Sequence, residues 1–390
     1  MDLSDHSIKY WLGVGGFYQF GSKRISALLS YFQNIESAYK ASAQELIQAG
    51  ISEKIGQEFL AYKEKINLDQ LLASAHKNNI KILTINDAIY PSNLKQTENH
   101  PIILYYKGEI PDSNQHTAHV AVVGTRKVTP YGARVTREIV SHLIKNNIVI
   151  ISGLALGVDT IAHQTTVDSN GKTIAILGNG LDNIYPPQNA KLAQDIIDTQ
   201  GAIMSEYPLG APALHYHFPY RNRIISGLSD ITIVTEADAD SGALITAKYA
   251  IQQGRSVYVV PGNIYSHMSS GCNKLINQGA KLITSPENIL EIIGNPTQKF
   301  TNPRSIKHAD TTTAKTIKKD LARHGAKTKI FHPDNPTETL ILKYLTEEPV
   351  HIDELVRKTN LTTQEVNSTL SIIELKGGAQ NIGGMNWIAT

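Results

Sequence analysis

The chain has 390 residues, of which 41% are hydrophobic and 28 are glycines. These values are typical of a globular protein with two or three domains, and they exclude a disordered or fibrous chain. The formal net charge is only +2, so any basic surface for a polyanion must come from the local arrangement of cations.

Residues 1–75 are predicted to form a small helical module. Apolar residues such as Ile25, Leu28 and Phe32 recur at the spacing of a helix face. Gly13, Gly15, Gly16 and Gly50 interrupt this pattern, which indicates short helices separated by tight turns.

Residues 76–295 are predicted to form an α/β core. Helical patterns at 131–146 and 157–168 alternate with short apolar runs, and Pro130 suits the first position of the first helix. Alternating strands and helices predict βαβ units in a doubly wound, mostly parallel sheet of the Rossmann-like class. The predicted strands are 119–124, 148–152, 173–178, 202–206, 230–235 and 256–260.

The last part of the chain is predicted to hold a linker and a third module. Residues 296–335 are polar, rich in Lys, Arg and Thr, and have few apolar residues to bury, as expected of a linker. Residues 336–390 read as three short helices followed by a hairpin, which is the outline of a winged helix. Thr362 and Glu365 fit a capping box at the start of the third helix.

Glycine-containing polar loops follow the first two predicted strands. Gly124, Thr125 and Arg126 come directly after the first strand, and Ser152 and Gly153 come just after the second, before a helix. Ligands of open parallel sheets bind outside the carboxyl ends of the strands, and free amides at helix starts favour phosphate. The convergence of several such loops indicates a phosphate site, although each loop taken alone can equally be a tight turn.

Two later loops are expected at the same edge of the sheet. Ser241 and Gly242 stand at the start of another predicted helix, and Asn273 and Lys274 belong to the loop region after the last strand. The helix start favours an anion. Asn273 and Lys274 are candidates to reach the ligand, while Lys274 can equally be a solvated surface residue.

The segment 217–230 places an aromatic ring and cations directly before an apolar run. Proteins that bind single strands use cations for phosphates and planar side chains for bases. Phe218 can supply the plane, Asn222 can bond a base edge or a phosphate, and Arg221 can hold the backbone. The alternative is a segment with a purely structural role.

The two arginines of this segment are expected to point in different directions, because they lie two residues apart. Arg221 is therefore assigned to the ligand. For Arg223 two interpretations stay open, a ligand contact and a buried pair with a carboxylate such as Glu206 or Glu236.

No catalytic or cofactor motif is found in the sequence. The dinucleotide fingerprint G-x-G-x-x-G and the P-loop are both absent, which disfavours a nucleotide cofactor. Asp159 and His163 lie four residues apart near Ser152, but Ser152 lacks the G-x-S-x-G elbow of a nucleophile. We interpret Asp159 as a helix-dipole partner and His163 as a satisfied, partly buried imidazole.

Metal binding and membrane contact are not expected either. Cys272 is the single cysteine, which suits a reducing cytosol, and His215 and His217 have no third ligand in view. The N-terminal residues lack the basic and apolar regions of a signal peptide, and the longest apolar run, 148–158, is too short to cross a bilayer. We expect a cytoplasmic protein without a cofactor.

Several motifs, in order along roughly residues 80–290, resemble the DprA (Smf) family of DNA-processing proteins. The helices before them resemble the family's SAM-like or helix-hairpin-helix module, and the final stretch resembles its winged helix. Leu209 and Ala243 depart from the usual family pattern without removing a charge. The segments that carry the resemblance are 123–126, 152–163, 177–189, 205–210, 218–229, 236–247 and 261–263.

The resemblance implies an extended Rossmann-like core that binds single-stranded DNA and forms a homodimer. It also implies that the protein protects incoming strands in natural transformation and loads the RecA recombinase onto them, without enzymatic activity. By motif, Arg126 and the segment 218–223 would be the main contacts with the strand.

Two rival functions stay open from the sequence. One is a nucleotide-processing enzyme of the nucleoside monophosphate phosphoribohydrolase type, although the comparable place, 241–247, lacks the glycine pair of the PGG-x-GT loop of such enzymes. The other is a regulator that reads duplex DNA through the winged helix. Its third predicted helix has little basic charge beyond Lys376, so we interpret this module as a protein contact or accessory element.

Overall fold

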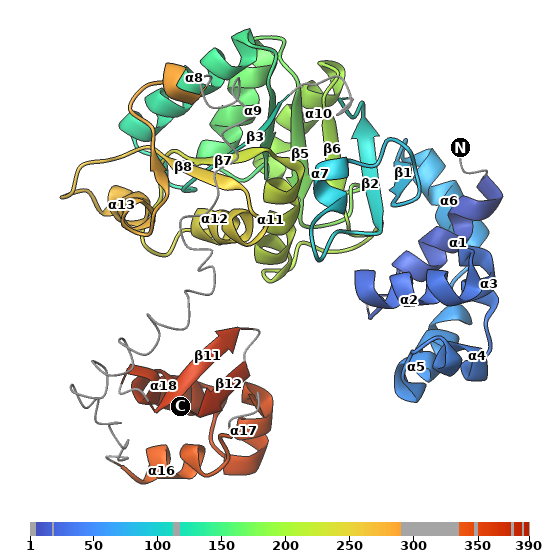
Figure 1. Cartoon of the computed structure of the whole chain (residues 1–390). Coiled ribbons are helices and arrows are strands. Elements are labelled where there is room, and N and C mark those ends of the chain that lie inside the picture. Colours follow the sequence, from blue (N-terminus) through green and yellow to red (C-terminus); the bar gives the residue numbers. More distant parts are fainter. Residues whose placement is uncertain are drawn as a thin grey trace, which may run out of the picture. The chain divides into compact units, whose positions relative to one another are not determined.

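The computed structural model describes residues 5–17, 19–111, 118–289, 335–346, 350–375, 378–383 and 386–389. The chain divides into two compact units, Met1–Asn302 and Pro303–Thr390 (Figure 1). Of the predicted linker, 296–335, residues 296–334 lie outside the described residues and residue 335 is described.

The first unit contains a nine-stranded sheet in its described residues, with the order β1-β2-β6-β5-β4-β3-β7-β8-β9. All pairs from β6 to β9 are parallel, whereas β2 pairs antiparallel with both β1 and β6. The predicted doubly wound, mostly parallel sheet is therefore confirmed. The strands are β1 (Lys81–Thr84), β2 (Ile103–Gly108), β3 (His119–Val123), β4 (Val149–Ser152), β5 (Thr173–Leu177), β6 (Ala202–Ser205), β7 (Ile231–Val234), β8 (Ser256–Val259) and β9 (Lys281–Leu282).

Helices cover both faces of this sheet, which explains why its central strands are apolar throughout (Figure 1). In β3, Val120 and Val122 pack with residues of α8 and α9, while Ala121 and Val123 pack with residues of α11 and α12. The helices are α7 (Ser92–Lys95), α8 (Pro130–Lys145), α9 (Val158–Asp168), α10 (Ala190–Asp198), α11 (His217–Leu228), α12 (Gly242–Gln252) and α13 (Ser270–Asn277).

The helices of the N-terminal segment share a core with the sheet edge. Phe59 of α5 packs with the aromatic rings of this segment, its centroid 4.6 Å from that of Phe20, and the same apolar cluster reaches Ile103 and Tyr105 of β2. The N-terminal helices and the sheet therefore form one compact unit. These helices are α1 (Asp5–Gly15), α2 (Ser22–Phe32), α3 (Ile35–Lys40), α4 (Ala43–Gln48), α5 (Glu53–Lys63) and α6 (Leu68–Lys77).

The second unit has the predicted winged-helix outline. Its described strands form an antiparallel sheet of order β10-β12-β11 against a core that includes Leu355, Leu370 and Trp387. The predicted capping box is present, because the Glu365 amide donates to Thr362 Oγ1 at 3.2 Å and the Thr362 amide donates to Glu365 Oε2 at 2.9 Å. The elements are α16 (Pro336–Leu342), β10 (Val350–His351), α17 (Ile352–Thr359), α18 (Thr363–Leu375), β11 (Ala379–Gly383) and β12 (Asn386–Ala389).

The order of the sheet fixes where a ligand site is expected. From β3 the chain adds β4, β5 and β6 on one side and then crosses to add β7 and β8 on the other side of β3. This reversal of strand order opens a crevice at the carboxyl end of β3. None of the helices in the described parts of either unit has the length and apolarity needed to cross a membrane.

Candidate nucleic-acid interface

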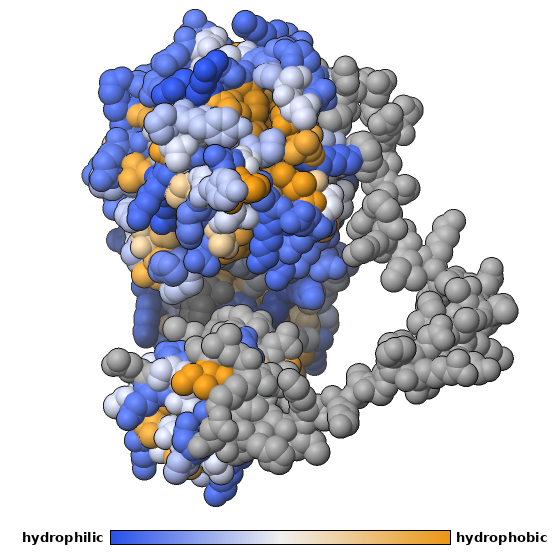
Figure 2. Space-filling view, turned by 90° about the vertical axis from the view of Figure 1, so that its left-hand side faces the viewer, coloured by the Kyte–Doolittle hydropathy of each residue, from blue (hydrophilic) through white to orange (hydrophobic). Residues whose placement is uncertain are grey.

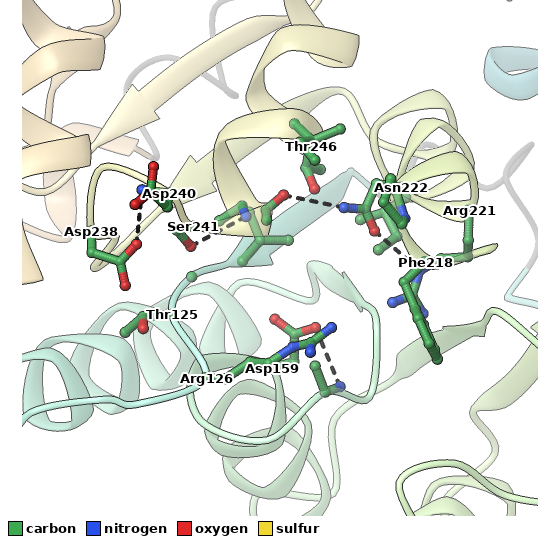
Figure 3. Close-up of a pocket in the computed structure, with 18 of the residues that line it drawn as sticks. Thr125, Arg126, Asp159, Phe218, Arg221, Asn222, Asp238, Asp240, Ser241 and Thr246 are labelled. Atoms are coloured by element: carbon green, nitrogen blue, oxygen red, sulfur yellow. Dashed lines mark hydrogen bonds between the residues drawn. The ribbon is translucent and has the colours of Figure 1, made fainter. Parts of the chain in front are cut away.

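A cavity of about 460 Å³ lies at this switch point, outside the end of β3 and against the first turns of α11 and α12 (Figure 3). Its lining comes from loops that are far apart in the chain. The predicted site residues that line it are Gly124, Thr125, Arg126, Phe218, Arg221, Asn222, Ser241 and Gly242.

The loop after β3 is held rigidly by backbone contacts. The Thr125 amide donates to Glu236 O at 2.7 Å, and its carbonyl accepts from the Val158 amide at 3.1 Å. A Cβ at Gly124 would lie 2.5 Å from Val158 Cγ2, so the close approach of this loop to α9 requires glycine. These contacts fix the position from which the Arg126 side chain leaves the loop.

Arg126 is the exposed cation of the predicted site that stands beside an aromatic ring. Its guanidinium lies 5.8 Å from the centroid of Phe218. Phe218 also contacts the exposed ring of Tyr185, with centroids 5.4 Å apart. Arg126 makes no ion pair in the part of the chain that the structure describes, so its charge remains available to a ligand.

Arg221 also lines the cavity, but its hydrogen bonds are internal. It is 4% exposed, and its Nη1 donates to Gly153 O at 2.8 Å and to Ile176 O. Burial lowers the pKa of Arg221 to about 10, against the opposing attraction of Asp159, so it stays a cation at neutral pH. Its hydrogen bonds tie α11 to the ends of β4 and β5 and thereby position the cavity floor.

Asp159 and His163 are likewise engaged in the interior. Asp159 Oδ2 accepts from the Gly153 amide at 3.0 Å, and although burial raises the pKa of Asp159, Arg221 and this amide favour its charged form. His163 is fully buried, with Nδ1 2.8 Å from Thr173 Oγ1, and burial lowers the pKa of His163 to about 3. His163 is therefore neutral at pH 7, and Asp159 stabilises the loop beneath the cavity.

The start of α12 forms the opposite wall of the cavity (Figure 3). Ser241 caps the helix by accepting from the Ala243 amide at 3.3 Å, and Asn222 Nδ2 donates to Gly242 O at 3.2 Å. A Cβ at Gly242 would meet no atom within 4 Å, so this first turn is open toward the ligand. The Ala243 and Leu244 amides donate to Ser241, so this turn offers a phosphate the Gly242 amide and the positive end of the helix dipole. Asp238 and Asp240 on the same wall restrict where a phosphate can lie.

Two predicted residues lie beneath the cavity and support it. The hydroxyl of Ser152 is fully buried and donates to Val122 O at 2.7 Å. A Cβ at Gly153 would lie 2.7 Å from Arg221 Nη2, so this glycine makes room for the guanidinium. Neither residue offers a side chain to a ligand.

The structure does not bring the remaining three predicted residues to the cavity. Arg223 points away from Arg221, as expected, and of the two interpretations left open the structure shows the buried pair, with Nη2 2.5 Å from Glu206 Oε2. Asn273 Nδ2 donates to Gly262 O at 3.3 Å. Lys274 lines a separate groove between α12 and α13.

Some residues of this site were not predicted from the sequence. Lys127 and His215 line the cavity. Lys127 follows Arg126 and His215 precedes the segment 217–230, so closeness in sequence to predicted site residues could have indicated both. Tyr185 reaches Phe218 from the loop between β5 and α10, and only the fold brings the two rings together. In the described ranges no three His, Cys, Asp or Glu residues gather as metal ligands.

Comparisons with known proteins decide the family. The family model described as DNA recombination-mediator protein A matches residues 81–294, and the model described as DprA winged helix domain matches residues 329–385. The chain belongs to the DprA/Smf family. It is 35% identical to Protein Smf of Synechocystis sp. over 97% of this chain and 98% of the relative, and 38% identical to DNA processing protein DprA of Streptococcus pneumoniae over 69% and 92%.

Solved structures of the DprA/Smf family agree with the fold. The X-ray structure of DprA from Streptococcus pneumoniae has a TM-score of 0.63 and 34% identity, and covers 75% of this chain and 98% of that one. DNA processing protein A from Helicobacter pylori, whose structure is titled for its single-stranded DNA binding mode, has a TM-score of 0.50 and 32% identity over 56% of this chain and 98% of its own.

Proposed function

We propose that this DprA/Smf protein binds single-stranded DNA in the cavity at the switch point and hands the strand to the RecA recombinase in natural transformation. The observation that carries the proposal is the position of Arg126, an exposed cation 5.8 Å from the Phe218 ring at the mouth of the cavity. A cation beside a stacking plane matches the alternating chemistry of an unpaired strand.

The two walls of the cavity supply complementary contacts. The open first turn of α12 and the guanidinium of Arg126 suit phosphates, whereas Phe218 and Tyr185 offer planes to successive bases. The Helicobacter pylori relative, named for its single-stranded DNA binding mode, supports this assignment. The contacts are to groups that every nucleotide carries, so we expect binding that tolerates any sequence.

We propose that no chemical step accompanies binding. Asp159, one of the carboxylates that line the cavity, accepts from two loop amides and interacts with the Arg221 guanidinium. His163 is fully buried and is therefore removed from a ligand. Because Asp159 is held by hydrogen bonds and His163 is buried, neither is free to act as an acid or base on a ligand. This favours a binding protein over the phosphoribohydrolase alternative.

Wild-type protein is expected to prefer single strands to duplex of the same length, and its affinity is expected to fall linearly on logarithmic axes as salt rises. The slope for single strands is about −0.7 per phosphate contact, because each contact releases condensed counterions. Fluorescence anisotropy with labelled oligonucleotides across a salt series measures both properties. Equal or tighter binding of duplex DNA, or an affinity that does not change with salt concentration, would contradict the proposed function.

We further propose that the protein is a homodimer and that the apolar groove between α12 and α13 takes the second copy. The groove measures about 330 Å³ and is lined by Leu244, Ile251 and Leu275, with Ile251 47% exposed and with Lys248 and Lys274 also in the lining. Leu282 of the short edge strand β9 is also 47% exposed. Figure 2, which views the side of the first unit where α13 lies, shows apolar patches among hydrophilic ones. Self-association covers both the apolar side chains and an open strand edge.

Ile251→Glu is expected to convert the dimer to a monomer, because it places a charge in the apolar groove. Light scattering coupled to size exclusion would then report half the wild-type mass. Ile89→Glu is the matched control, since Ile89 is 58% exposed and lies outside the groove. A wild-type protein that is monomeric at high concentration, or an unchanged mass in Ile251→Glu, would exclude this dimer face.

A further inference from the structure

A second cavity, of about 440 Å³, lies between the N-terminal helices and the edge of the sheet. Its walls come from α1, α5 and α6 on one side, and from β2 and the loop residues Asp182 and 208–210 on the other. Its volume is within the range of small-molecule sites, and its lining is mostly apolar, as such sites require. It is separate from the cavity proposed for DNA, with which it shares no lining residue.

Two phenols in this cavity have unused hydroxyl groups. Tyr105 of β2 is 2% exposed and lines the cavity together with Tyr62 of α5, and neither hydroxyl forms a hydrogen bond within the described part of the chain. Burial raises the pKa of Tyr62 to about 12 and raises the pKa of Tyr105 further, so both are neutral donors at pH 7. Neither hydroxyl oxygen is enclosed by protein, so both are open to the cavity and can donate to acceptor atoms of a bound molecule.

The remaining polar groups define the charge of that molecule. Ser74 of α6 and Asn78, the residue that follows this helix, are neutral. Asn78 Nδ2 donates to Ser74 O at 2.8 Å, which leaves the amide oxygen of Asn78 to other donors. Asp182 at the rim accepts from the Gly210 amide at 2.9 Å. The lining residues that the structure describes include Asp182 and no Lys, Arg or His. Lys107 interacts electrostatically with Asp182 but lies outside this lining, so a phosphate inside the cavity would meet the carboxylate without a lining cation.

We propose that this cavity binds a neutral purine nucleoside. The flat ring packs between the apolar side chains and the two phenols, whose hydroxyls donate to its ring nitrogen and carbonyl acceptors. Ser74, Asn78 and Asp182 accept from the amino and sugar hydroxyl groups. This site is independent of the DNA-binding function proposed above.

The test uses the full-length protein and isothermal titration with adenosine and guanosine. At least one nucleoside is expected to bind, and its 5′-monophosphate is expected to bind more weakly, because no cation compensates the phosphate. Tyr105→Phe should weaken nucleoside binding about fivefold to tenfold through the loss of one buried hydrogen bond. Tyr106→Phe is the matched control, since Tyr106 is the next residue of β2 and packs against the cluster on the other face of the sheet.

A second variant covers the case in which Tyr105→Phe alters the fold. Ser74→Phe fills the cavity from partly exposed α6 and is expected to abolish nucleoside binding while leaving single-stranded DNA binding unchanged. The proposal is overturned if neither nucleoside binds at millimolar concentration, if the monophosphate binds as tightly, or if Ser74→Phe has no effect. Loss of nucleoside binding in Arg126→Ala would also overturn it, because the ligand would then occupy the DNA cavity.

Discussion

Replacing Arg126 with alanine is expected to weaken single-stranded DNA binding about tenfold to a hundredfold, because a charge-assisted contact with phosphate is lost. The same change should make the salt dependence shallower by about 0.7, the value for one phosphate contact. The Arg126 side chain is exposed, so the free energy of unfolding should change by no more than about 0.5 kcal/mol. Anisotropy titrations at several salt concentrations, together with urea unfolding, measure all three quantities.

Arg134→Ala provides the matched control for this prediction. Arg134 is an exposed arginine of α8 that pairs with Glu138 at 2.8 Å and does not line the cavity. It removes the same charge from the protein, so a general electrostatic effect would appear in both variants. An Arg126→Ala protein with the salt slope and affinity of the Arg134→Ala control would exclude Arg126 from contact with DNA.

Arg223→Ala is expected to lower the free energy of unfolding by about 3–5 kcal/mol, the usual effect of breaking a buried ion pair from one side. The Arg223 and Glu206 side chains are 6% and 13% exposed, and the Arg223 guanidinium also lies 4.0 Å from the Tyr220 ring. Without Arg223 the Glu206 carboxylate would be buried and uncompensated. Urea unfolding monitored by circular dichroism measures the loss.

The double variant Arg223→Met with Glu206→Leu separates the ion pair from simple packing. Apolar residues of similar volume often replace a buried pair without net cost, so the double variant should recover most of the stability. Its DNA affinity should keep the wild-type salt slope, because Arg223 is committed to Glu206. A loss below about 1 kcal/mol in Arg223→Ala would show that the pair is not buried as described.

The contrast between the neighbouring arginines shows where sequence reasoning reached its limit. Their spacing predicted that Arg221 and Arg223 diverge, and the structure agrees. The spacing does not tell which direction leads to the ligand or how deep each side chain lies. Arg221 is at least as buried as Arg223. Of the arginines that line the cavity, only Arg126 has an uncommitted guanidinium within the described residues, and its position depends on the loop after β3.

The central fold was predictable because burial on both sheet faces leaves a continuous apolar run in each strand. The strands from β3 to β8 all have this character, and all were predicted. The strands β1 and β2 were missed because they form an antiparallel hairpin-like extension outside the alternating pattern, and β9 has only two residues. Their pairing depends on tertiary contacts with β6 and β8.

The candidate site was predictable to the extent that loops at strand ends converge in this class of sheet. Gly124–Arg126 and Ser241–Gly242 follow that rule and meet across the cavity. Ser152 also stands at a strand end but does not reach the ligand side of the cavity, because its hydroxyl points into the sheet and donates to Val122 O. Asn273 and Lys274 do not line the cavity either, because they belong to α13, whose preceding loop leads away from the switch point.

Photo-crosslinking tests the central claim most directly. An unpaired oligonucleotide that carries 5-iodouracil should crosslink to an aromatic ring on which its base stacks, and mass spectrometry of the digested complex identifies the peptide. Crosslinks are expected at Phe218 or Tyr185, with loss of the Phe218 crosslink in Phe218→Leu. No change is expected in Tyr216→Leu, because Tyr216 is an exposed tyrosine outside the cavity lining. Crosslinks confined to the winged-helix unit or to the N-terminal helices would contradict the central claim.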